Sequence, residues 1–118
     1  MAPPRFTECA FNGNVALVTL IFPDNQIMKK EDIDAMGREL VKLIDVGAHE
    51  MVVNFENIEY MSSAAIAKFI RIQRRISDRG GKLVLCQIPP QIYEVFEITR
   101  FHHLFKIVAT QADALREF

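Results

Sequence analysis

The strongest constraint on the fold is the alternation of short apolar runs with longer amphipathic segments. The runs are rich in Val, Leu, Ile and Phe, and in the segments between them apolar residues recur every three or four positions, the spacing of one buried helix face. The predicted strands cover residues 5–11, 14–22, 51–55, 83–86 and 105–108. The predicted helices cover residues 30–46, 62–79, 91–98 and 110–117. Strands separated by helices are expected to pair in parallel through right-handed crossovers.

The first two predicted strands form an antiparallel hairpin. Asn12-Gly13 lies between them, and Asn-Gly is a strong hairpin signal because both central residues of such a turn take positive φ. The second strand is apolar on both faces, which indicates an interior position in the sheet. We therefore expect one α/β domain over residues 1–118. It has a mixed, mostly parallel sheet of about five strands, an N-terminal β-hairpin and about four helices.

Composition places the chain among cytoplasmic globular proteins. Its 118 residues are 50% hydrophobic and 25% charged, which is ordinary for one domain. No apolar run approaches the roughly 18 residues that a membrane span needs, and residues 1–5 lack the apolar core of a signal peptide. Cys9 and Cys86 are far apart and belong to no paired motif, so reduced thiols are expected.

Charge is unevenly distributed along the chain, although the net charge is only −1. Residues 62–82 contain six basic residues against the single Asp78, and acidic residues dominate the preceding part of the chain. The basic strip indicates either a partner surface or a solvated helix face. Nucleic-acid binding is not expected, because it usually requires a basic excess across the whole domain.

The sequence contains no pattern that predicts an enzyme. The Gly80-Gly81 pair precedes a predicted strand, whereas a phosphate-binding glycine loop would follow one. His102 and His103 are adjacent, so on a regular element they point in different directions and do not form a metal site. No nucleophile elbow is present. We therefore expect no catalytic residues, no metal and no cofactor.

The junction before the second helix is the most informative polar segment. A buried strand ends near residue 55, a short polar loop follows, and Ser62 and Ser63 open the helix. In one interpretation Ser62 is only an N-cap, worth roughly 1 kcal/mol. In the other, a serine here is a switch, because a phosphate adds about −1.5 to −2 charge where the helix dipole favours it. Phosphorylation would then leave the fold unchanged and prevent binding of a partner.

The whole chain resembles the STAS domain, in particular the small anti-sigma factor antagonists of bacteria. The family hallmark is a strand and loop followed by Asp-Ser-Ser-Gly-Leu at the start of a helix. It aligns with Ser62-Ser63-Ala64-Ala65-Ile66. Residues 80–86 resemble the next turn and strand of the family, and residues 95–107 resemble its Leu-Phe-x-Ile segment.

The alignment implies that Ser63 is the phosphorylated serine, with Ser62 as the acceptor if the register shifts by one residue. Ser62 replaces the family's Asp, which removes a carboxylate from the start of the helix. Ala65 replaces its Gly, which places a Cβ where a partner would need close approach. Arg100 and Phe101 replace Gly and Leu in the later segment.

The resemblance also implies a partner. The unphosphorylated protein would bind an anti-sigma factor that is itself a serine protein kinase of histidine-kinase-like ATPase fold, and a serine phosphatase would reverse the phosphorylation. The residues expected at this interface are Asp24, Asn25, Ser62, Ser63, Ala64, Lys68 and Arg71. An alternative is a structural STAS subunit that is never phosphorylated and scaffolds a larger signalling complex. Small-ligand binding ranks third, because the sequence shows no dedicated pocket residues.

Overall fold

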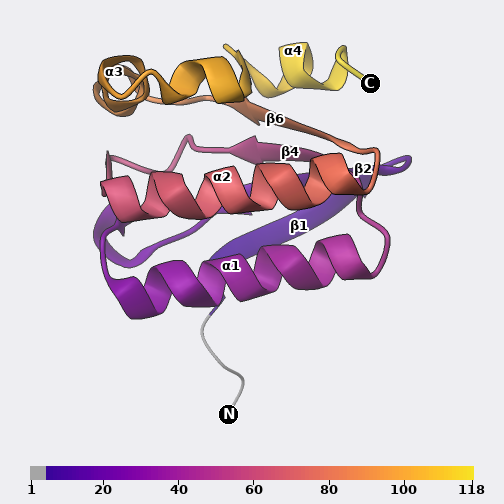
Figure 1. Ribbon diagram of the computed structural model, residues 1–118, viewed down its shortest axis with the longest axis horizontal. Coiled ribbons are helices and arrows are strands. Elements are labelled where there is room, and N and C mark those ends of the chain that lie inside the picture. Colours follow the sequence, from indigo (N-terminus) through magenta and orange to yellow (C-terminus); the bar gives the residue numbers. More distant parts are fainter. Residues whose placement is uncertain (1–4) are drawn as a thin grey trace.

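The computed structural model describes residues 5–118 as helices packed on a five-stranded sheet (Figure 1). The strands are β1 (Thr7–Asn12), β2 (Val15–Leu20), β3 (Gln26–Ile27), β4 (Glu50–Asn54), β5 (Tyr60–Met61), β6 (Lys82–Cys86) and β7 (Lys106–Val108). The α-helices are α1 (Lys30–Asp45), α2 (Ser63–Asp78), α3 (Pro90–Ile98) and α4 (Gln111–Leu115), and two 3₁₀ turns cover Pro23–Asn25 and Phe101–Leu104. The expectation about a signal peptide concerns residues that lie almost wholly outside the described range. Among residues 5–118, no helix is both long and apolar enough to cross a bilayer.

The five-stranded sheet has the order β1-β2-β4-β6-β7, and every neighbouring pair is parallel except the β1-β2 hairpin. This confirms the predicted mixed sheet and the interior position of β2. The hairpin turn differs from the prediction by one residue. Asn12 pairs with Val15, so the two central residues are Gly13 and Asn14. Gly13 takes φ +60°, and a glycine at the first central position is typical of a type II′ turn.

Helices cover both faces of the sheet. α1 and α2 lie side by side on one face (Figure 1), and their apolar stripes bury the larger core against it. In this core the rings of Phe55 and Phe69 pack with their centroids 5.3 Å apart. The opposite face carries a smaller cluster in which Ala114 of α4 covers Val52, Val84 and Cys86. Burial on both faces explains why the central parallel strands are apolar at consecutive positions.

Two details of the chain differ from the sequence-based prediction. Residues 26–27 and 60–61 form a separate two-stranded parallel sheet, β3-β5, where only loops were expected. In the last helix the sequence pattern predicts Ala112, Leu115 and Phe118 as the inward residues, but the fully buried residue is Ala114, and Ala112 and Phe118 are exposed. The helix begins where predicted, because the Thr110 hydroxyl accepts a hydrogen bond from the Asp113 N–H (3.1 Å). Its five residues then present one face to the sheet.

Burial of Cys86 in the smaller core predicts a loss of stability at high pH. Burial, and secondly the negative charge of Glu56, raise the pKa of this thiol from 9.0 to about 11. Between these two values the unfolded chain releases the thiol proton while the folded chain keeps it, so the free energy of unfolding falls as pH rises. At about pH 10.5 the loss should reach about 2 kcal/mol.

Urea unfolding of the wild type and of Cys86→Ala at pH 8 and at about pH 10.5 measures this effect. Other titrating groups contribute equally to both proteins, so the comparison isolates the thiol. Wild type should lose more stability than the variant as pH rises. A stability difference between the two proteins that does not change with pH would contradict the prediction.

Candidate partner-binding site

The loop between β4 and α2 is held in place by a buried amide. Asn54 ends β4 and is buried. Its Oδ1 accepts a hydrogen bond from the Glu56 N–H (2.8 Å), and its Nδ2 donates to Gln111 Oε1 (3.0 Å). The Ile58 N–H donates to the Phe55 carbonyl (3.0 Å), which closes a turn. These contacts direct the chain back across the sheet edge toward the start of α2.

The β3-β5 pairing brings a distant loop against the start of α2. The Ser62 N–H donates to the Ile27 carbonyl (3.0 Å), and the Glu59 N–H donates to the Asn25 carbonyl (2.8 Å). Asp24 and Asn25 are exposed, and both take left-handed backbone conformations, with φ of 55° and 56°. Asp and Asn tolerate this region better than most residues. The two loop residues predicted from the sequence therefore lie alongside the segment that leads into the serine pair, with Asn25 opposite Glu59.

The two serines at the start of α2 have different surroundings. Ser62 is the N-cap: its Oγ accepts from the Ala65 N–H (3.3 Å), and its carbonyl accepts from the Ile66 N–H (3.3 Å). Ser63 is the first helical residue and is exposed, as is Ala64. Within residues 5–118 the N–H groups of Ser63 and Ala64 have no acceptor. The first turn also contains no acidic residue. The Ser63 hydroxyl thus lies at an accessible helix N-terminus whose partial positive charge is uncompensated.

Comparison with known proteins identifies the family. The STAS domain sequence model matches residues 15–114. The chain belongs to the STAS domain family. BtrV of Bordetella bronchiseptica, named as an anti-sigma factor antagonist, is 26% identical over 92 residues, which cover 78% of this chain and 79% of BtrV.

Solved structures share the fold. The crystal structure of a Thermotoga maritima protein named as an anti-sigma factor antagonist superimposes with a TM-score of 0.82 at 19% identity, covering 94% of this chain and 92% of that one. The Bacillus cell fate determinant SpoIIAA, solved in its phosphorylated form, superimposes with a TM-score of 0.71 at 15% identity, covering 94% and 97%.

One departure from the STAS hallmark has a different consequence from the one expected. Ala65 replaces the family's Gly, and its Cβ was expected to obstruct a partner. Ala65 is fully buried, so its side chain faces the core of the domain. The methyl group therefore adds packing under α2 and leaves the outer surface at Ser63 unchanged.

Lys68 and Arg71 lie farther along α2 than the serine pair. Lys68 is only 21% exposed and forms an ion pair with Asp34 of α1 (3.3 Å). Arg71 is exposed and has no ion-pair partner within the described part of the chain. Eight residues separate it from Ser63, which is about 12 Å along the helix axis. The STAS domain thus holds the Asp24-Asn25 loop alongside the segment that leads into Ser62–Ala64, and Lys68 and Arg71 lie farther along α2.

The structure adds two residues that sequence reasoning missed. Tyr60 in β5 is 61% exposed, and Met28, next to Ile27 in β3, is 51% exposed. Both flank the serine pair, because β5 leads directly into Ser62 and Ile27 bonds to it. Large exposed apolar side chains, aromatic residues and Met above all, are enriched in protein interfaces. Two-residue strands are too short for a periodic pattern, so the sequence held no signal for this exposure.

The histidine pair behaves differently from the prediction. The rings of His102 and His103 lie against each other, with centroids 4.0 Å apart, because both residues belong to a 3₁₀ turn. His102 Nδ1 is 3.1 Å from the Phe96 carbonyl oxygen. Across residues 5–118, no three His, Cys, Asp or Glu side chains are grouped closely enough to hold a metal ion.

Proposed function

We propose that this STAS domain is an anti-sigma factor antagonist switched by phosphorylation of Ser63. The unphosphorylated protein binds an anti-sigma factor that is also a serine kinase of histidine-kinase-like ATPase fold. Phosphorylation of Ser63 ends the binding, and a serine phosphatase restores it. The observation that carries the proposal is the exposed Ser63 at an uncompensated helix N-terminus, directly after the segment that pairs with the Asp24–Ile27 loop.

The position of Ser63 suits a switch that leaves the fold intact. A phosphate there meets the free N–H groups of the first turn and the positive end of the helix dipole, both of which favour negative charge. The domain therefore tolerates the modification. The phosphate instead lowers the affinity for the docked partner, through charge repulsion and steric exclusion. The relative BtrV, named as an anti-sigma factor antagonist, and SpoIIAA, solved in a phosphorylated form, support this assignment.

The proposed interface has an apolar part and a polar part. Tyr60 and Met28 supply the apolar contacts that usually contribute most binding energy. The polar part consists of Asp24, Asn25, Ser62, Ser63 and Ala64, with Lys68 and Arg71 at the periphery. Ser62 contributes as the N-cap that orients Ser63, since its own Oγ is engaged by the Ala65 N–H.

A structural STAS subunit that is never phosphorylated is the second candidate. The replacement of the family's Asp by Ser62 favours it, because the carboxylate that would accompany the acceptor serine is missing. In that case the same surface would bind a partner permanently.

Phosphopeptide mass spectrometry on protein isolated from its own cells distinguishes the two candidates. Trypsin releases residues 43–68 as one peptide, which contains Tyr60, Ser62 and Ser63. We expect a phosphate on Ser63 whose occupancy differs between growing and stressed cells. Consistent absence of phosphate at good coverage in all conditions would favour the permanent subunit, and a phosphate on Ser62 would move the acceptor by one residue.

A further inference from the structure

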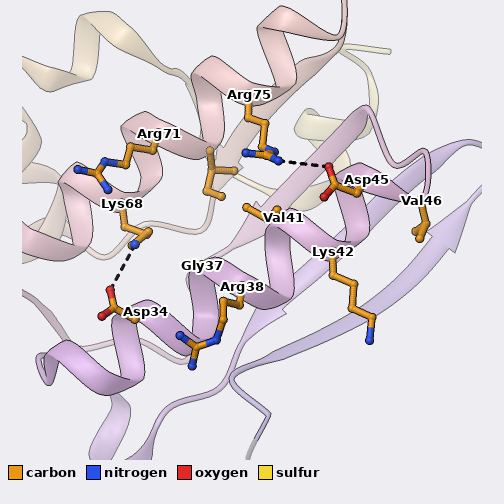
Figure 2. Close-up of a pocket in the computed structure, with 11 residues that line it drawn as sticks. Asp34, Gly37, Arg38, Val41, Lys42, Asp45, Val46, Lys68, Arg71 and Arg75 are labelled. Atoms are coloured by element: carbon orange, nitrogen blue, oxygen red, sulfur yellow. Dashed lines mark ion pairs between the residues drawn. The ribbon is translucent and has the colours of Figure 1, made fainter.

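A trough of about 550 Å³ lies between α1 and α2, on the side of these helices that faces away from the sheet (Figure 2). Its floor is apolar and is formed by Gly37 and Val41 of α1 and Ile72 of α2. The volume falls within the range of about 300–1,000 Å³ that is usual for small-molecule sites. The trough is separate from the Ser63 hydroxyl, which does not line it.

Ion pairs close the trough at both ends. Lys68 reaches from α2 to Asp34 (3.3 Å) at one end, and Arg75 reaches to Asp45 (3.5 Å) at the other (Figure 2). Arg79 also forms an ion pair with Asp45 (3.0 Å), so two arginines hold the carboxylate at this second end of the trough. Lys68 and Arg75 are about 10 Å apart along the axis of α2, and Asp34 and Asp45 are about 16 Å apart along the axis of α1. The floor between the two ion pairs is therefore about 10–16 Å long.

The absence of a side chain at Gly37 makes room for the ion pair between Lys68 and Asp34. A Cβ at this position would lie 2.7 Å from Lys68 Cδ. The aliphatic part of Lys68 therefore lies directly over Gly37, which lets its ammonium group reach Asp34 across the helix pair. The result is an apolar floor with a positively charged wall.

The rim of the trough has an excess of positive charge. Five cationic side chains line it against two carboxylates, and both carboxylates are already paired with Lys or Arg. Arg38, Lys42 and Arg71 have no ion-pair partner among the residues that the structure describes. An anion at this rim would gain attraction from three cations without displacing an existing pair.

We propose that the trough binds a small amphiphilic organic anion. The ligand has a compact apolar body that covers Val41 and Ile72, and one or more acidic groups that meet the unpaired cations of the rim. The spacing of the two ion pairs favours a body of about 10–16 Å. This inference does not rest on the function proposed for Ser63, although the trough shares Lys68 and Arg71 with the periphery of the proposed interface.

Titration with two matched probes tests the proposal. 1-Anilinonaphthalene-8-sulfonate has a compact aromatic body and a sulfonate, and N-phenyl-1-naphthylamine has the same body without the charge. Calorimetry and fluorescence at low salt should show one saturable site for the anion on the full chain, and at least tenfold weaker binding of the neutral probe. The anion should also raise the melting temperature, since a ligand of the native state stabilises it.

Variants locate the site. Val41→Trp fills the trough and Arg38→Glu reverses one rim charge, so each should weaken binding of the anion at least fivefold. Arg74→Glu is the matched control: Arg74 is an exposed residue of α2 outside the trough, and its loss should change binding less than twofold. Far-UV circular dichroism verifies that each variant is folded.

Three outcomes would overturn the proposal. The first is no saturable binding of the anion to the folded protein, and the second is equal binding of the neutral probe. The third is binding that Val41→Trp and Arg38→Glu leave unchanged. Ser63→Asp should leave the affinity for the anion unchanged, so the result does not depend on the phosphorylation switch.

Discussion

Ser63→Asp should lower the affinity for the anti-sigma factor partner at least 100-fold, whereas Ser63→Ala should change it less than threefold. Ser63 is exposed in the first turn of α2, directly after the β5 segment that pairs with β3, so a carboxylate there introduces charge at the centre of the proposed interface. Like-charge contact or an unpaired buried charge in an interface costs several kcal/mol, which is the size of this effect. Isothermal titration calorimetry without ATP measures both variants.

The fold provides a control for this prediction. Aspartate in the first turn of a helix stabilises it by about 0.3–1 kcal/mol, so Ser63→Asp should unfold at the same or a higher temperature than wild type. Ser77→Asp adds the same charge to the exposed last turn of α2 and should leave partner affinity unchanged. If Ser63→Asp bound as tightly as Ser63→Ala, the surface at Ser63 would not be the contact site.

Gly81→Ala should destabilise the domain by about 3 kcal/mol, at the upper end of overpacking costs. A Cβ at Gly81 would lie 1.9 Å from the backbone oxygen of His49. That oxygen accepts a hydrogen bond from the Lys82 N–H (2.9 Å), and the Gly81 N–H donates to the Ile76 carbonyl (2.9 Å). The contact lies between the residues that precede β4 and β6, so relief of the clash requires the two backbones to move apart at the start of the β4-β6 pairing.

Gly80→Asn is the matched control for the second prediction. Gly80 takes φ +72°, and a Cβ there would have no atom within 4 Å. Asparagine tolerates this backbone conformation, so the variant should lose less than about 1 kcal/mol. Urea unfolding at pH 7 measures both variants. If the free energy of unfolding of Gly81→Ala were within 1 kcal/mol of the wild-type value, the backbones at Gly81 and His49 would be able to move apart without loss of stability, and the prediction would be wrong.

Much of the fold was predictable because its signals are local. The α1 and α2 helices begin and end within one or two residues of the prediction, since their apolar stripes and the Gly80-Gly81 pair mark them in the sequence. The β1-β2 hairpin was also found, although its turn is one residue later than expected. Pairing across the hairpin decides the turn position, and the dipeptide signal alone does not.

The candidate site was predictable only in part. Ser62 and Ser63 were identified because an N-cap and the first helical residue have a sequence signature. Tyr60 and Met28 were missed, because their exposure depends on the two-residue pairing of β3 with β5. The expected effect of Ala65 was wrong, because the direction of its Cβ depends on how α2 is rotated against the sheet.

The sequence by itself determined which segments form strands and helices, that the sheet is mostly parallel, and that two serines begin α2. These features follow from periodicity, capping and turn chemistry within a few neighbouring residues. Only the tertiary structure decided that the Asp24-Asn25 loop lies against the segment that leads into Ser63, and that α1 and α2 leave a cationic trough between them. These features depend on contacts between residues far apart in the chain, which arise only when the helices pack on the sheet.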